Sequence, residues 1–295
     1  RYPMKKYLAI INPISGTGSK KSIPELLGQA YSSADGELFL TYTKAAGHAE
    51  ELARRAAEEG FEEVIAVGGD GTVNEVARAL LGTNTALGIV PKGSGNGLAR
   101  SLGIAMNSEE AIRQLSTGRR ICIDSCTMDG RPFFCTCGMG FDATVSHAFA
   151  EASSRGPVTY FRTMVEEYRG FQAENYHITL DGERSFDTEA FVLVAANATQ
   201  YGNNAYIAPE ADLADGFLDL ALIRPFPGIE AAFVLGDLML GRLPNNKYYY
   251  TERARELIIE RSSPGVIHLD GEPCHAGERV EVRLIPQSLH VIIPA

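Results

Sequence analysis

The sequence predicts an α/β domain followed by an antiparallel β-sandwich domain, because the rhythm of its predicted elements changes once along the chain. Over roughly the first 120 residues, short β-rich runs alternate with helical segments, which is the pattern of a parallel sheet covered by helices. Beyond that point strands arrive in pairs around Asp-Gly dipeptides, a strong short-range signal for a β-hairpin. The predicted domains are therefore 1–121 and 122–286.

The first domain is predicted to contain strands that alternate with amphipathic helices. The strands are expected over 6–12, 37–43, 62–68 and 85–91, and the helices over 22–30, 48–60 and 73–82. The second of these helices has a clear signal, because Ala49, Leu52, Ala53 and Ala56 hold the i, i+3, i+4, i+7 spacing of one helix face. Gly60 follows them as a C-terminal stop.

The second domain is marked by turn signals and by two helical insertions. Its Asp-Gly dipeptides begin at Asp129, Asp181, Asp215 and Asp270. The helical insertions are expected over about 142–171 and over 228–243. The last segment, 287–295, either completes the β domain or returns to the first sheet, and the sequence leaves both possibilities open.

The composition excludes some classes of partner. The chain has 295 residues, of which 45% are hydrophobic, so it can bury a large core. Its formal net charge of −10 at pH 7 argues against nucleic acid as a principal partner, since phosphate backbones are held by an excess of Lys and Arg. Because no apolar run approaches the ~18 to 20 residues of a membrane span, a cytoplasmic location is expected.

A glycine-rich loop with one carboxylate follows the strand predicted over 62–68. A strand that ends in Gly-Gly-Asp-Gly-Thr (68–72) and enters a helix can bring bare backbone N–H groups against a phosphate chain, since glycine carries no Cβ. Asp70 would repel a naked phosphate, so its presence predicts a mediator, either Mg²⁺ or an ordered water. The alternative is an ordinary strand-to-helix turn in which Asp70 caps the helix.

A second glycine loop, PKGSGNGLAR (91–100), repeats this arrangement at the end of the next strand. Two such loops at neighbouring strand ends form a cleft where open α/β sheets bind their ligands. Neither loop matches GxxxxGK[ST] or a GxGxxG fingerprint. The loop over 12–21 offers a further anion contact, or is merely solvated, through Gly16, Gly18, Lys20 and Lys21.

These motifs resemble the diacylglycerol kinase catalytic domain family, especially the soluble bacterial lipid kinases related to diacylglycerol kinase and sphingosine kinase. The resemblance begins with GGDGTVNEV and a downstream P-x-G-[ST]-x-N loop. It covers nearly the whole chain in the family's order, through NPISG, YTKAAGHA, IDSCTMDGRPFFCTCGMGFDA, APEADLADGFLDL and LDGEP. It implies a fold like that of NAD kinase and diacylglycerol kinase, with the nucleotide in a cleft between the two domains.

The resemblance also implies roles for individual residues in binding Mg²⁺ and ATP. Asn12 and Thr43 would approach the nucleotide. The residues that would line its phosphates and their Mg²⁺ are Gly68, Gly69, Asp70, Gly71, Thr72, Asn74 and Ser94. Each of them has the alternative role of an ordinary turn or capping residue.

The catalytic base that the resemblance implies is Glu272 of LDGEP, with Asp270 and Asp124 as supporting acids. The alternative for Glu272 is a plain hairpin with exposed acids. DLADGFLD (212–219) resembles a stretch that holds a structural Mg²⁺ in bacterial members. Its ligands would be the carboxylate of Asp215 with carbonyl oxygens of Asp212 and Phe217, unless it is a metal-free turn.

Several functions remain open at this stage. The resemblance implies an ATP- and Mg²⁺-dependent kinase for diacylglycerol or a related lipid, met by transient contact with a membrane surface. The segments 228–243 and 160–171 are candidates for that contact, and a homodimer is possible. Where diacylglycerol-type members tend to have Asn-Asp, this chain has Asn96 and Gly97, which favours the alternative of a sphingoid-base or ceramide kinase. NAD kinase and a non-catalytic nucleotide or lipid sensor are further alternatives.

Overall fold

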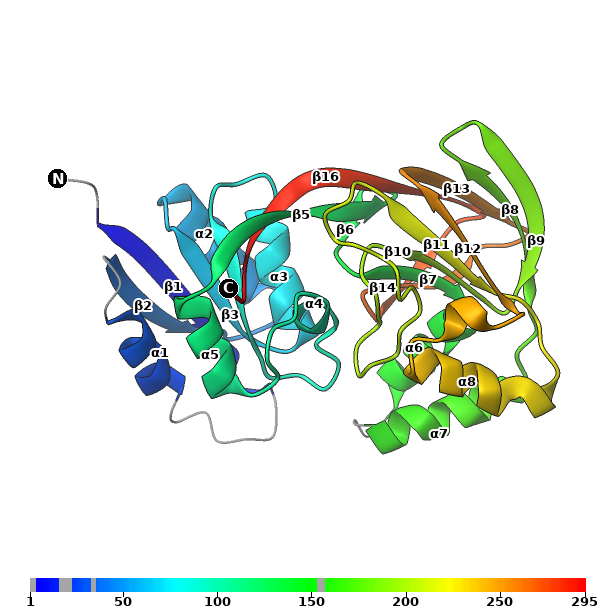
Figure 1. Ribbon diagram of the computed structural model, residues 1–295, viewed down its shortest axis with the longest axis horizontal. Helices are drawn as coiled ribbons and strands as arrows, with labels where there is room; N and C mark the ends of the chain where they lie inside the picture. The colour runs from blue at the N-terminus through cyan, green and yellow to red at the C-terminus, as the bar shows by residue number, and fades with distance from the viewer. Residues whose placement is uncertain (1–3, 16–22, 33–35, 153–156) are drawn as a thin grey trace. The chain divides into compact units, whose positions relative to one another are not determined.

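The computed structural model, whose elements are labelled in Figure 1, describes residues 4–15, 23–32, 36–152 and 157–295. The chain forms two compact units, Arg1–Ile123 with Gln287–Ala295, and Asp124–Pro286. The last strand, β16 (Arg279–Ile293), is shared between them, since its Val291 pairs in parallel with Leu87 of the first unit. The last segment therefore returns to the first sheet.

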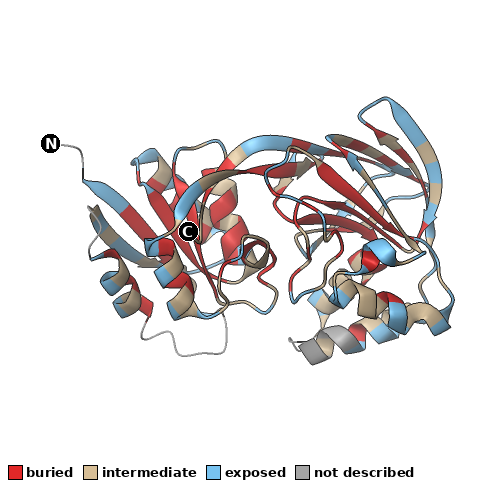
Figure 2. Ribbon diagram, in the orientation of Figure 1, coloured by how far each residue is buried: buried red, intermediate tan, exposed pale blue. Residues whose placement is uncertain are grey.

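A parallel sheet in the order β2-β1-β3-β4 forms the centre of the first unit. Its strands are β1 (Lys5–Ile11), β2 (Gly36–Tyr42), β3 (Glu63–Gly68) and β4 (Ala86–Pro91). Every residue of β3 and β4 is buried, as Figure 2 shows by colour. Strands covered on both faces read as near-continuous apolar runs, which explains the sequences EVIAVG and ALGIVP.

Helices pack on both faces of this sheet. They are α1 (Ile23–Tyr31), α2 (His48–Glu58), α3 (Asp70–Leu80), α4 (Gly97–Ser101) and α5 (Ser108–Ser116). Helices α1 and α5 share a core cluster with Ile65 and Val67 of β3. Because side chains alternate along a strand, Ala66 faces the other side, where α2 and α3 pack on each other.

The second unit is a sandwich of antiparallel sheets. One sheet has the order β12-β11-β10-β7-β14-β15, and in the other β16 pairs with β13, which pairs with β8, which pairs with β9. The strands of the first are β7 (Thr136–Gly140), β10 (Val192–Ala196), β11 (Leu218–Ile223), β12 (Tyr249–Ala254), β14 (Gly265–Leu269) and β15 (Glu272–Ala276). Besides β16, the remaining strands are β5 (Arg119–Met128), β6 (Arg131–Phe133), β8 (Glu174–Leu180), β9 (Arg184–Ala190) and β13 (Glu256–Arg261).

The two sheets enclose one apolar core, and helices cover the outer face of the six-stranded sheet. Met139, Leu220 and Ile259 lie in the core between the sheets. The helices are α6 (Phe141–Glu151), α7 (Pro157–Tyr168) and α8 (Ala231–Met239), with 3-10 turns η1 (Gly228–Glu230) and η2 (Leu243–Asn245). The insertion expected over 142–171 is thus two helices. Within the described ranges, no helix combines the length and apolarity that crossing a membrane requires.

The Asp-Gly dipeptides of this unit do not all play the same part. Those beginning at Asp129, Asp181 and Asp270 have positive φ at both residues, with values of 47° and 79°, 52° and 68°, and 51° and 83°. Positive φ at both central residues is the geometry of a tight type I′ hairpin turn. At Asp215 only the following glycine has positive φ, 78°, and the segment leads into β11 instead of forming a hairpin.

Candidate functional site

The two glycine loops lie at the carboxyl end of the parallel sheet, one after β3 and one after β4. The strands stay paired to their ends, because Lys92 N donates to Gly68 O at 2.7 Å. The first loop enters α3, whose first residue is Asp70. The second enters α4 through Asn96, which takes a left-handed backbone with φ 53°. This edge is where open α/β sheets bind ligands.

The carboxylate of Asp70 joins the two loops. Its Oδ2 accepts the backbone N–H of Asn96 at 2.9 Å, and its Oδ1 accepts that of Gly97 at 2.8 Å. The Asp70 carboxylate therefore has backbone N–H partners inside the protein, whether or not Mg²⁺ or an ordered water also links it to a phosphate. Each carboxylate oxygen keeps a further lone pair after accepting one N–H, so the donor set still suits a hard cation.

The glycines allow the loops to approach each other. A Cβ on Gly93 would lie 2.8 Å from Gly69 Cα, and one on Gly95 would lie 2.9 Å from Asp70 Oδ2. Real Cβ atoms do not tolerate such contacts, so side chains at these positions would force the loops apart. From the sequence, these glycines are expected to allow the close approach of a ligand. The structure adds a reason that requires no ligand, namely the packing of one loop against the other.

Two further predicted nucleotide contacts follow β1 and β2, which lie on the side of β3 away from β4 in the same sheet. Asn12 follows β1, and its Nδ2 donates to Thr72 Oγ1 at 3.0 Å while its Oδ1 accepts the N–H of Ile14 at 2.9 Å. Thr43 follows β2 and donates its backbone N–H to Ile11 O at 3.0 Å. Both residues therefore stand at the carboxyl end of their strands, the end that carries the glycine loops.

The predicted phosphate-binding residues differ in exposure. Gly71 and Ser94 are exposed, whereas Thr72 and Asn74 are buried. A buried hydroxyl or amide is better placed to hold the loops than to meet a ligand first. The anion contacts expected in the loop over 12–21 fall on residues outside the described part of the chain.

In the second unit, Asp270 holds a hairpin turn between β14 and β15. Its Oδ2 accepts the N–H of Phe134 at 2.9 Å, and its Oδ1 accepts those of Cys135 at 2.7 Å and Thr136 at 3.0 Å. Burial raises the pKa of the Asp270 carboxyl, and the three N–H donors oppose this rise. The turn is thereby fixed to the start of β7, and Glu272 follows it as an exposed residue at the start of β15.

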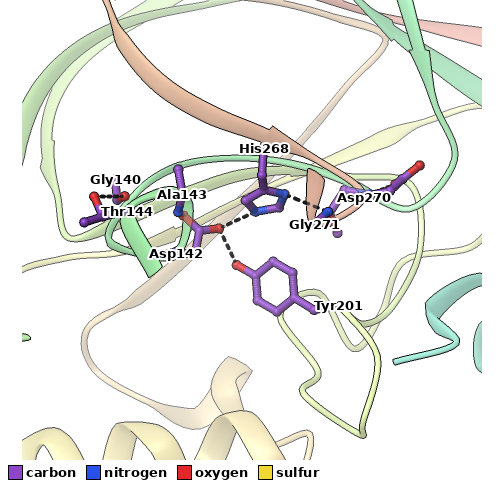
Figure 3. A network of polar contacts seen from close by, with 9 residues as sticks. Gly140, Asp142, Ala143, Thr144, Tyr201, His268, Asp270 and Gly271 are labelled. Atoms are coloured by element: carbon purple, nitrogen blue, oxygen red, sulfur yellow. Dashed lines mark hydrogen bonds and ion pairs between the residues drawn. The ribbon is translucent and has the colours of Figure 1, made fainter. Parts of the chain in front are cut away.

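Sequence reasoning missed a buried polar network beside this turn, which Figure 3 shows. His268 Nε2 lies 2.9 Å from Asp142 Oδ2, and the same oxygen accepts the hydroxyl of Tyr201 at 2.8 Å. The other ring nitrogen, His268 Nδ1, accepts the backbone N–H of Gly271 at 3.3 Å. Asp142 lies in the stretch IDSCTMDGRPFFCTCGMGFDA and His268 directly precedes LDGEP, but no local spacing pairs them.

Asp124 and the predicted metal-binding segment lie together in the second unit. Asp124 Oδ2 accepts the N–H of Gly216 at 2.8 Å, and its own N–H donates to Leu213 O at 2.7 Å. Asp124 therefore holds this segment in place. Among the predicted ligands, Asp212 Oδ1 accepts the N–H of Ala214 at 2.9 Å. Asp215 Oδ1 likewise accepts that of Phe217, at 3.0 Å.

A neighbouring carboxylate bears on whether a cation fits this segment. Asp219 is buried, and its Oδ2 has no hydrogen-bond partner among the described residues. Burial, with the charge of Asp215 nearby, raises the pKa of Asp219 to about 6. Asp215 Oδ2 pairs with Arg253, whose charge lowers the pKa of Asp219.

These oxygens suit a hard cation. Within the described ranges, no three His, Cys, Asp or Glu side chains are arranged to hold a metal. Mg²⁺ there would therefore need water in addition to the backbone carbonyls of the predicted ligand set.

Comparison with known proteins places these features in context. A model of the diacylglycerol kinase catalytic domain matches residues 6–128, and one of the YegS C-terminal NAD kinase beta sandwich-like domain matches residues 135–293. A probable lipid kinase YegS-like of Chromohalobacter salexigens is 32% identical over 293 residues, covering 94% of this chain and 91% of that protein. The diacylglycerol kinase of Bacillus subtilis is 28% identical over 301 residues, covering 99% and 97% respectively.

Solved structures agree on the fold. A diacylglycerol kinase of Bacillus anthracis str. Sterne superposes with a TM-score of 0.77 at 20% identity, covering 99% of this chain and 98% of that chain. Another chain from this organism has a TM-score of 0.81 at 24% identity, covering 98% and 97%. These likenesses, with the two family models, confirm the predicted α/β domain and antiparallel β-sandwich domain.

Proposed function

Since the chain belongs to the diacylglycerol kinase family of lipid kinases, we propose that it transfers the γ-phosphoryl group of ATP to the hydroxyl of diacylglycerol or a related glycerolipid. The observation that carries this proposal is the double contact of Asp70 with the backbone N–H groups of Asn96 and Gly97. It locks two glycine loops side by side at the ligand-binding edge of a parallel sheet.

The first unit would bind the nucleotide. The N terminus of α3 and the backbone N–H groups of the glycine loops favour negative charge, and exposed Gly71 and Ser94 are the first groups a phosphate would meet. Asp70 retains lone pairs that would hold Mg²⁺ beside the phosphates. When bound, Mg²⁺ would neutralise charge on the transferred phosphoryl group.

The second unit would supply the base. Glu272 is exposed at the start of β15, so its carboxylate can meet a substrate hydroxyl and accept its proton. Phosphoryl transfer needs little other covalent chemistry from the protein, since positioning and charge stabilisation dominate. In this proposal Asp270 does not touch the substrate. It fixes the turn before Glu272 through the three N–H contacts described above.

An apolar surface of the second unit would meet the membrane that contains the lipid. Ile229, Phe233 and Leu240, on η1 and around α8, are 85%, 68% and 63% exposed. Val234 of the same helix is buried in the domain core, so α8 is attached on one side and apolar on the other. Such a helix can lie in the bilayer interface without spanning it. In the other segment predicted to contact the membrane, 160–171, Val165 of α7 is 40% exposed.

The proposal is tested by incubating the protein with [γ-³²P]ATP, Mg²⁺ and mixed micelles that contain diacylglycerol, monoacylglycerol, sphinganine or ceramide. Label is expected in a glycerolipid, and removal of Mg²⁺ by EDTA is expected to abolish it. Label in sphinganine or ceramide alone would mean that the acceptor is a sphingolipid and not a glycerolipid, and it would give Gly97 a role in specificity. Label in none of the lipids would overturn the proposal, and a parallel assay with NAD⁺ would then separate an NAD kinase from a non-catalytic sensor.

A further inference from the structure

We propose that His268 is a positioning residue for the turn that carries Glu272, and that Asp142 and Tyr201 hold its imidazole in one tautomer. This inference rests on the proposed function for the role of Glu272, but its structural part stands on the contacts of the second unit alone. Figure 3 shows the residues involved. The sequence resemblance gave none of these three residues a role.

The space for the imidazole is provided by a glycine on the neighbouring strand. His268 of β14 lies directly opposite Gly138 of β7 in the antiparallel register. A Cβ on Gly138 would lie 2.1 Å from His268 Nε2 and 2.2 Å from Asp142 Oδ2. The ring and the carboxylate therefore fill the space that any other residue at 138 would take. Both are withdrawn from solvent, with side-chain exposures of 1% for His268 and 11% for Asp142.

The hydrogen bonds define which ring nitrogen carries the proton. The N–H of Gly271 is a donor and points at His268 Nδ1 at 3.3 Å, so Nδ1 must present a lone pair. In a neutral imidazole the proton then sits on Nε2, which donates to Asp142 Oδ2 at 2.9 Å. A carboxylate that accepts the ring N–H is a common way to fix a histidine tautomer.

Asp142 is itself held from other sides. Its Oδ2 also accepts the hydroxyl of Tyr201 at 2.8 Å, and its Oδ1 accepts the N–H of Ala143 at 2.8 Å. The Tyr201 ring lies against the imidazole, with ring centroids 5.7 Å apart. The carboxylate therefore has little freedom to leave the histidine, and the histidine has little freedom to rotate.

The consequence is that the turn is fixed at both of its central residues. Asp270 is held through its carboxylate and Gly271 through its N–H, so the peptide that leads directly into Glu272 has a defined orientation. A misplacement of about 1 Å at a reacting group can cost roughly 100-fold in rate. His268 would thus act on kcat through Gly271 without touching the substrate.

Two replacements separate the contacts of the two ring nitrogens. In His268→Asn the amide oxygen can take the place of Nδ1 and accept the N–H of Gly271. In His268→Gln the amide nitrogen can take the place of Nε2 and donate to Asp142, while the contact to Gly271 is lost. His268→Ala removes both contacts. All three variants lose the imidazole itself, so a purely structural role would make their activities follow their melting temperatures.

The positioning role predicts a different order. The kcat of lipid phosphorylation is expected to fall about 100-fold in His268→Ala and His268→Gln, with the KM for ATP unchanged, and to be largely retained in His268→Asn. Protection of the Gly271 amide from hydrogen exchange should follow the same order. Equal kcat in His268→Asn and His268→Gln, or a wild-type kcat in His268→Ala, would overturn the inference.

A readout that needs no activity keeps this test separate from that of the proposed function. The ¹⁵N chemical shifts of the His268 ring in the wild-type protein are expected to show a proton on Nε2 and none on Nδ1. A proton on Nδ1, or an unprotected Gly271 amide, would refute the positioning role even in an active kinase. Wild-type protein that labels no acceptor would instead refute the proposed function, and with it the link to Glu272.

Discussion

The sequence Leu-Asp-Gly-Glu occurs twice in this chain, at 180–183 and at 269–272, and the two copies form the same backbone turn. In each, both the Asp and the Gly have positive φ. In each, the Asp carboxylate accepts backbone N–H groups of residues at or just before the start of a neighbouring strand. Asp181 accepts those of Arg255 at 2.8 Å and Glu256 at 2.9 Å, as Asp270 accepts three. The motif itself is therefore a device for attaching a hairpin to a sheet.

The surroundings of the two copies differ. Asp181 is exposed, whereas Asp270 is half-buried. Two residues before the Asp, the first copy has Thr179 and the second has His268, which accepts the N–H of Gly271. The motif therefore supplies the turn, and any function comes from what packs around it. The first copy is thus a control that the chain itself provides.

The largest effect is expected from replacing the glutamate of each copy. Glu272→Gln removes the proposed base and is expected to lower kcat about 10²- to 10⁴-fold, a typical range for loss of a general base. Glu183→Gln, also at an exposed position, is expected to leave kcat unchanged. Steady-state transfer of ³²P to lipid measures both. Equal activities for the two variants would mean that the copies do not differ in function.

A smaller effect is expected from replacing the aspartate of each copy, and it is measured as a loss of unfolding free energy. Asp270→Asn leaves an amide facing three N–H donors and is expected to cost about 2 to 3 kcal/mol of unfolding free energy, since hydrogen bonds to charged groups are the stronger ones. Asp181→Asn should cost less unfolding free energy, because the N–H groups that donate to Asp181 can form hydrogen bonds with water instead. Urea unfolding of both variants makes the comparison. An Asp270→Asn protein as stable as Asp181→Asn would argue against the clamping role of Asp270.

Unlike Asp270, Glu63 is a buried carboxyl to which no backbone N–H donates in the described part of the chain. Glu63 of β3 accepts only the hydroxyl of Tyr31, at 3.0 Å to each oxygen, among the contacts found in the described chain. Burial raises its pKa from 4.5 to about 8. The folded state therefore keeps the proton at pH values where the unfolded state has lost it.

The sign of the resulting pH dependence follows from this shift. The contribution of Glu63 to stability is complete below pH 4.5 and is lost as the pH rises through about 8. The loss runs at about 1.4 kcal/mol per pH unit inside that window. Glu63→Gln is expected to remove this decline, so its melting temperature should fall less than that of the wild type between pH 5 and pH 9, with kinase activity unchanged. An identical decline in both proteins would contradict the raised pKa.

Much of the fold could be predicted because it rests on local patterns. The buried strands β3 and β4 are apolar runs bounded by turn residues, and three of the four Asp-Gly dipeptides of the second unit form the predicted hairpin turns. Helix α5 was missed although a signal exists. Asn107 caps it by accepting the N–H of Glu110 at 3.1 Å, and an Asn followed three residues later by Glu is a recognisable helix start.

The site could be predicted only in part, for a physical reason. Glycine loops and an Asp-Gly-Glu turn are contiguous in sequence, so their residues can be listed without a structure. The contact of His268 with Asp142 joins positions 126 residues apart, and that of Asp70 with Gly97 crosses between two loops. Such contacts depend on strand register and on helix placement, which a single sequence does not specify. The role of Gly93 and Gly95 in packing one loop against the other could not be predicted for the same reason.

The affinity for Mg²⁺-ATP, measured by calorimetry without lipid in wild type, Glu272→Gln and Asp70→Asn, separates nucleotide binding from proton acceptance. In the proposed function the glycine loops bind the nucleotide and Glu272 accepts the proton. Glu272→Gln is therefore expected to bind ATP as the wild type does, while Asp70→Asn, whose amide cannot accept both loop N–H groups, should bind at least about ten-fold more weakly. Wild-type affinity in a folded Asp70→Asn protein, or lost affinity in Glu272→Gln, would contradict these roles.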